Sequence, residues 1–211
     1  MTNWEEELQH LKIRLAQMCQ LAEGMLRDVQ ALLETRLPQA AQEIVERDRL
    51  VNEAELELER TCMRLLLRHQ PFAKDFRDVS CILKIITDIE RIADQARDIA
   101  DAMRNLRSHT MDDMLREMGQ LALKMVQDGI QSFLHEDMEQ ARRTALLDDR
   151  MDAMFTAMKR ELAEAIAACP ESADQGLELL MIGKYYERIS DHAVNICEWT
   201  EMDAQGVHNK Y

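Results

Sequence analysis

The chain has 211 residues, a length that fits one large domain or two small ones. Its 6 glycines, 3 prolines and 4% aromatic residues are too few for the frequent tight turns of a β-sandwich or an α/β sheet, so we expect an all-α protein. The 26 basic and 40 acidic residues give a net charge of −14 at pH 7. This charge argues against general binding to nucleic-acid backbones and to anionic lipid headgroups.

Cysteine usage and hydropathy indicate the compartment. The five cysteines form no CxxC pair, and each lies in a run that is typical of a helix, which indicates reduced thiols. The segment Met1–Glu7 lacks the basic start and apolar stretch of a secretory signal, and no run of about 18 apolar residues occurs. We therefore expect a cytoplasmic protein that reaches a membrane only through protein partners.

Prolines divide the chain into helices, because each proline removes a backbone donor and disfavours the helical conformation of the residue before it. Pro38, Pro71 and Pro170 mark three such breaks, and Ser108 and Thr110 are candidate N-caps at a connection between two halves. Short connections imply antiparallel neighbours. The predicted helices cover residues 5–36, 38–69, 74–107, 111–134, 137–168 and 172–202.

The second half of the chain repeats the first. Glu90–Ile99 matches Glu187–Ile196 at an offset of 97 residues, with Glu, Arg, Ile, Asp, Ala and Ile in common, and a weaker match at an offset of 100 relates the second helices. We therefore predict two tandem antiparallel three-helix bundles, in residues 1–108 and 109–211.

Acidic residues recur on one face of the third helix of each half. Their spacing of 4, 4 and 3 places them within about 80° of arc, and carboxylates four residues apart repel unless a cation lies between them. Magnesium, manganese, zinc and iron ions accept such oxygen ligands. The candidate ligands are Glu90, Asp94, Asp98 and Asp101 in the first half and Glu187, Asp191, Asn195 and Glu198 in the second.

A solvated acidic face is the alternative interpretation of these stripes. The stripe of the first half lies opposite the isoleucines of the same helix, and Arg91, Arg97 and Arg188 could neutralise the acids without a metal. Because the spacing occurs twice, although solvation needs only some charge, we keep both interpretations.

Asp48 lies in the arc of Ile44, Val51 and Leu58, where an ionised carboxylate is costly unless it is paired. Its partner is either an arginine across the bundle or a cation shared with the third helix. The same choice applies to Asn52, Asp148 and Asp152.

The sequence lacks the common motifs of enzymes, which argues against catalysis. The only Glu-x-x-His is Glu7–His10, whereas a ferritin-like di-iron centre needs one on each of two helices. No GxGxxG, Walker loop, GxSxG or HExxH occurs, so we expect no catalytic residues and no organic cofactor. A redox-active helical-bundle metalloenzyme remains the alternative from another class. His192 is expected at the surface.

The repeated motifs resemble those of the PhoU family of phosphate-transport regulatory proteins. Glu90–Asp94 and Glu187–Asp191 are similar to its paired E/D-x-x-x-D motifs, and Val45–Asn52 is similar to its second-helix signature. Gln70–Arg77 resembles the loop that leads into the third helix, and Leu83–Ile89 precedes the first motif as in relatives. The resemblance covers essentially the whole chain.

The resemblance implies a cytoplasmic, non-catalytic negative regulator of phosphate uptake and of the phosphate-starvation response. It implies an adaptor between the ATPase subunit of a phosphate ABC transporter and a sensor histidine kinase, and it implies a homodimer. It also implies iron or zinc on the E/D-x-x-x-D surfaces, with the third-helix stripes as ligands and the second-helix acids as further candidates. The alternative within the wider family is an accessory protein of a low-affinity phosphate permease.

Overall fold

The computed structural model describes residues 3–107 and 109–205, and all regular structure within these ranges is helical. The helix boundaries agree with the predicted ones to within three residues, except in the fifth predicted helix. The elements are α1 (Asn3–Thr35), α2 (Pro38–His69), α3 (Ala73–Asn105), α4 (Asp112–Leu134), α5 (Met138–Ala145), α6 (Asp148–Ala168), the 3₁₀ turn η1 (Pro170–Ser172) and α7 (Ala173–Gln205).

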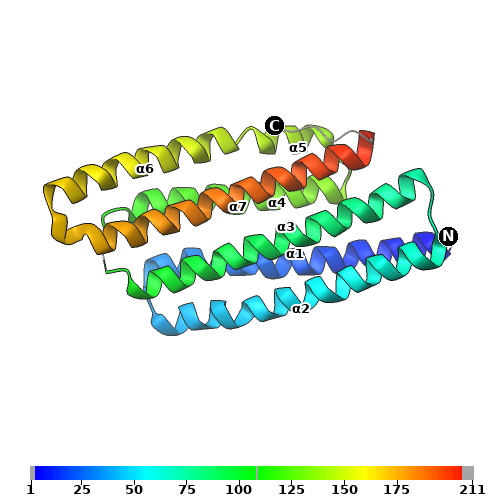
Figure 1. Cartoon of the computed structure of the whole chain (residues 1–211), viewed down its shortest axis with the longest axis horizontal. Helices are drawn as coiled ribbons and strands as arrows, with labels where there is room; N and C mark the ends of the chain where they lie inside the picture. Colours follow the sequence, from blue (N-terminus) through cyan, green and yellow to red (C-terminus); the bar gives the residue numbers. More distant parts are fainter. Residues whose placement is uncertain (1–2, 108, 206–211) are drawn as a thin grey trace.

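The helices run side by side along the long axis of the molecule (Figure 1). α1, α2 and α3 form one bundle, and α4, α6 and α7 form the other, with the short α5 packed on α4 and α7. The predicted fold class is therefore confirmed. The boundary between residues 108 and 109 stays a prediction, since Ser108, one of the two candidate N-caps, lies outside the described residues.

The two bundles share one hydrophobic core. α3 and α7 make the most extensive contact between helices, and α1 also packs against α4. The isoleucines of α3 that recur at three-four spacing are fully buried, as the sequence predicts. Tyr186 of α7 is buried as well, and its hydroxyl accepts a hydrogen bond of 3.2 Å from Gln30 of α1. Each half therefore completes the core of the other.

Hydropathy of the helices bears on membrane insertion. Within the described residues, no helix is both long enough and apolar enough to cross a membrane.

The single helix predicted over residues 137–168 is wrong. The structure breaks it at Leu146–Leu147 into α5 and α6. α5 is held on α7 by the buried Ala141 and Ala145 and by an ion pair between Arg142 and the fully buried Glu201. Two adjacent acids, Asp148 and Asp149, then lie in the first turn of α6, where the helix dipole favours them. Neither glycine nor proline occurs at this break. Dividing the sequence at its prolines therefore did not predict it.

The start of α4 also differs in detail from the prediction. α4 begins at Asp112 and its N-cap position is Met111, so Thr110 does not cap it. The acidic pair Asp112 and Asp113 lies in the first turn instead.

A buried carboxylate on α3 joins the two halves. Asp88 accepts hydrogen bonds from three residues of α7: His192 (2.9 Å), Asn195 (3.0 Å) and the indole of Trp199 (3.0 Å). His192 is thus a half-buried contact residue of the interface, which corrects the expectation of a surface position. A charged acceptor surrounded by three donors fixes the register of α3 against α7.

We predict that Asp88→Ala lowers the free energy of unfolding by about 3 kcal/mol, because it leaves buried donors on α7 without an acceptor. Urea denaturation followed by circular dichroism measures this change. Asp101→Ala, at an exposed position of the same helix, is the control and should stay within about 0.5 kcal/mol of the parent. Equal stability of the Asp88→Ala protein and the parent would show that this contact does not hold the halves together.

Candidate functional site

Acidic side chains of α2 and α3 meet along a surface that we call the first acidic seam, made of Asp48, Asn52, Glu90, Asp94 and Asp98. Arg97 of α3 lies among them. Its guanidinium is 3.1 Å from Asp48, 2.6 Å from Asp94 and 2.9 Å from Asp98. Burial lowers the pKa of Arg97, but the hydrogen bond to Asp98 and the charges of Asp94 and Asp48 outweigh it and raise that pKa. In this seam an arginine is therefore the partner of Asp48, one of the two options left open by the sequence.

Glu90 of the first acidic seam is only partly compensated, by an ion pair with Arg91 at 3.3 Å. Burial and the nearby charge of Asp94 raise its pKa to about 7, although Arg91 lowers it. Glu55 of α2 adds to the repulsion. A carboxyl group with this pKa carries a proton for part of the time at neutral pH, and a cation would compete with that proton.

The second acidic seam lies between α6 and α7 and consists of Asp148, Asp152, Glu187 and Asp191. Burial, together with the charges of Glu187 and Asp148, raises the pKa of Asp191 to about 6. Burial also raises the pKa of Asp148, against a hydrogen bond from Ser190 that lowers it. Lys184, three residues before Glu187 on α7, forms an ion pair with it. The charges of this seam therefore repel one another more than they are neutralised.

The two seams differ at the position of the bridging arginine. Val194 stands where the repeat would place a counterpart of Arg97, 97 residues further on. Val194 packs beside Ala141, Ala145 and Cys197. In the first seam the guanidinium of Arg97 thus joins α2 to α3. Among residues 3–107 and 109–205, the ion pair of the second seam is that of Glu187 with Lys184, which lies within α7.

The remaining predicted ligands lie elsewhere. Asp101 pairs with Arg104 at 3.2 Å and lines a hollow together with Glu178 and Tyr185 of α7. Asn195 donates to Asp88 across the interface between the halves, and Glu198 is buried on α7. The structure therefore brings together only part of each predicted stripe. The C-terminal residues of each stripe lie toward the contact between α3 and α7 instead.

The donor atoms of both seams suit a hard cation. Asp48 and Asn52 each keep a buried side-chain oxygen without a hydrogen bond, and so do Glu90 and Asp148. Carboxylate and amide oxygens are the ligands of magnesium and manganese and are accepted by iron and zinc. In the conformation described for residues 3–107 and 109–205, no three His, Cys, Asp or Glu side chains already converge on a common point.

Asp88, which links the two halves, is a contact that the sequence analysis did not identify. It lies three residues after Ile85 and four before Ile92, so it occupies the apolar face of α3. The same signal, an acid within an apolar stripe, had singled out Asp48. Applied to the whole of α3, it would have found Asp88 as well.

Together, the fold and the seams define a class: a duplicated helical-bundle protein with a related acidic seam in each half. Comparison with known proteins agrees with this class. The family model described as "PhoU domain" matches residues 15–103 and again residues 115–200. The chain belongs to the PhoU family, and the resemblance drawn from its motifs is confirmed.

Relatives of this family cover nearly the whole chain. The phosphate-specific transport system accessory protein PhoU homolog of Clostridium acetobutylicum is 29% identical over 201 residues, which is 93% of this chain and 92% of the relative. A homolog from Thermotoga maritima is 32% identical over 200 residues, 93% of this chain and 86% of the relative. The crystal structure of PhoU from Pseudomonas aeruginosa superposes with a TM-score of 0.94 at 29% identity, covering 97% of this chain and 100% of that one.

We predict that Glu90→Gln flattens the pH dependence of stability between about pH 4.5 and 7. The folded state raises the pKa of Glu90, so it holds a proton that the unfolded chain has lost in this range. Stability therefore falls as the pH rises through this window, and this contribution disappears when residue 90 cannot ionise.

Urea midpoints at pH 5, 6, 7 and 8 measure the effect. Glu43→Gln, at an exposed position of α2, is the control for the loss of one charge. Parallel pH profiles for Glu90→Gln and the parent would show that folding does not raise the pKa of Glu90.

Proposed function

We propose that this PhoU-family protein is a cytoplasmic negative regulator of phosphate uptake and of phosphate-starvation signalling. In this role it acts without catalysis, as an adaptor between the ATPase subunit of a phosphate ABC transporter and a sensor histidine kinase. The observation that carries the proposal is the match of both halves to the PhoU domain, combined with relatives that are named accessory proteins of the phosphate-specific transport system. The homodimer implied by the resemblance stays a prediction.

Two features of the chain support an adaptor. Figure 1 shows α2 beside α3 and α6 beside α7, with α3 and α7 in contact between them. The two seams, which follow the α2–α3 and α6–α7 pairs, therefore offer related surfaces in both halves. The net charge of −14 favours partners with basic surfaces.

We also propose that the acidic seams bind divalent or ferric ions, and that the second seam binds them more tightly. Asp148, Asp152, Glu187 and Asp191 would supply the oxygen ligands there, and Asp48, Asn52, Glu90 and Asp94 would supply them in the first seam. A bound ion would neutralise the seam and hold its two helices together. Turning exposed carboxylates toward one ion costs at most about 2 kcal/mol for each side chain.

The difference in affinity follows from Arg97. In the first seam its guanidinium already neutralises Asp48, Asp94 and Asp98, so an ion must displace it or bind beside it. In the second seam, an ion relieves the repulsion that raises the pKa of Asp191.

We predict that Glu187→Gln/Asp191→Asn weakens metal binding at least about tenfold, while Glu90→Gln/Asp94→Asn has a smaller effect. Arg97→Gln should strengthen binding to the first seam. Elemental analysis and metal titration of protein purified without chelator or poly-His tag measure both changes.

Asp149→Asn/Glu171→Gln removes the same charge at exposed positions outside the ligand set and is the matched control. Unchanged metal content in both seam variants, or no metal uptake by the parent, would remove the metal-binding part of the proposal. Oxygen consumption on addition of Fe²⁺ would instead favour the metalloenzyme alternative.

We predict that the transporter ATPase or the sensor kinase co-purifies with this protein from its native cells. The set of partners bound to an adaptor should change when the phosphate supply changes. Quantitative mass spectrometry therefore compares cells grown with ample phosphate and cells starved of it. Loss of both partners under both conditions would exclude the adaptor role. Retention of a low-affinity permease in their place would favour the alternative within the wider family.

A further inference from the structure

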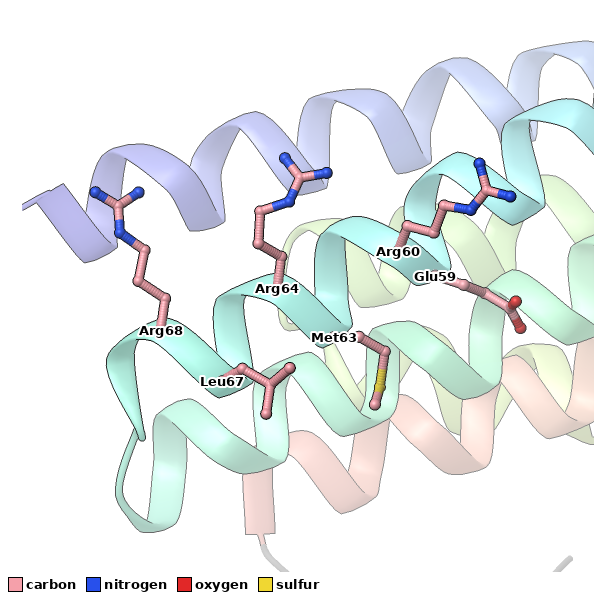
Figure 2. A pocket seen from close by; sticks show the side chains of 6 residues that line it. All are labelled: Glu59, Arg60, Met63, Arg64, Leu67 and Arg68. Atoms are coloured by element: carbon pink, nitrogen blue, oxygen red, sulfur yellow. The ribbon is translucent and has the colours of Figure 1, made fainter.

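α2 carries an exposed face that takes no part in the core or in the acidic seams. Arg60, Arg64 and Arg68 form a row along one side of this face, and Met63 and Leu67 lie on the other side (Figure 2). Together with Glu59 they line a shallow groove of about 570 Å³. We call this surface the arginine face.

The apolar side of the arginine face is unusually exposed. Leu67 keeps 75% and Met63 keeps 52% of its surface accessible to solvent. At the same end of the α2–α3 pair, Phe72 is 88% and Phe76 is 53% exposed. Single exposed apolar side chains are ordinary, but four large ones within 14 residues indicate a surface that a partner covers.

The charge of this face contrasts with the rest of the chain. Successive arginines are four residues apart, so the row extends over about 12 Å of helix. Arg68 pairs with Glu7 at 2.9 Å, whereas within the described ranges no ion pair engages Arg60 or Arg64. Two uncompensated guanidinium groups next to apolar side chains therefore stand out on a protein with a net charge of −14.

We propose that the arginine face is a docking site for an acidic amphipathic helix of a partner protein. Aspartates or glutamates of that helix, four residues apart, would pair with Arg60 and Arg64, and apolar residues on its adjoining stripe would cover Met63 and Leu67. Arginine suits this role because its planar guanidinium binds carboxylates in two-point fashion and packs against apolar groups. When a helix binds in a groove, its contact residues recur every three or four positions, and this matches the four-residue spacing of Arg60 and Arg64.

Charge decides between possible occupants. An anionic membrane is disfavoured, because the whole chain is strongly acidic and Glu57 and Glu59 lie on the same helix. A second copy docked symmetrically on this face would bring Arg64 close to its own counterpart, which is repulsive. A single partner helix can place its few carboxylates against Arg60 and Arg64 and turn uncharged residues toward Glu59, whereas a membrane presents anionic headgroups to the whole acidic surface.

This inference goes beyond the adaptor role, because it assigns a surface that uses none of the proposed metal ligands. It rests on that role only in requiring a partner protein. Binding of a synthetic probe to purified full-length protein can fail without any effect on the outcome of the co-purification experiment.

The probe is a fluorescent helical peptide of about 20 residues, with glutamates four residues apart beside a leucine stripe. Fluorescence anisotropy should show binding that weakens about tenfold in Arg60→Gln/Arg64→Gln, and that weakens in Leu67→Asn as well. A peptide with glutamine in place of glutamate should bind correspondingly less, and added salt should reduce the difference.

Lys159→Gln/Arg160→Gln removes the same charge at exposed positions of α6 and is the matched control, which should bind the probe like the parent. Circular dichroism checks that each variant keeps its helix content. Absence of probe binding by the parent, or equal weakening in the control, would overturn the proposal. So would binding to vesicles of phosphatidylglycerol and phosphatidylcholine that depends on Arg60 and Arg64 in the absence of peptide binding.

Discussion

Carboxylates that lie between long, closely packed helices must find a positive or hydrogen-donating partner, and this constraint organises the whole molecule. Asp48 meets it through Arg97 within the first bundle. Asp88 meets it through three donors of α7 and so joins the two bundles. The second acidic seam meets it only in part, and that is where a cation would contribute most.

Gene duplication accounts for the similarity of the halves, and the positions where the copies diverged account for their separate roles. Arg97 and Val194 occupy matching positions, so one copy neutralises its own seam and the other does not. A similar divergence places Asn195 opposite Asp88, where its amide donates a hydrogen bond that a carboxylate could not supply. The repeat therefore preserved the fold while the electrostatics of each half changed.

Much of the fold could be predicted from the sequence, because prolines and apolar stripes determine where long helices end and which face they bury. The break between α5 and α6 could not, since it depends on how Arg142 and Ala145 contact α7 rather than on a breaking residue. For the site, helical spacing placed Glu90 and Asp94 on one seam. Spacing could not show that Asn195 faces α3, because periodicity identifies a face of a helix but not the neighbour that the face meets.

We propose that a cation completes the structure at the second acidic seam. Anomalous diffraction from crystals of protein purified without chelator tests it most directly, because the signal identifies the metal and locates it between particular helices. We expect a metal ion between α6 and α7, in contact with Asp148 and Asp191. Crystals of metal-loaded protein with an ion only between α2 and α3, or with none in either seam, would contradict it.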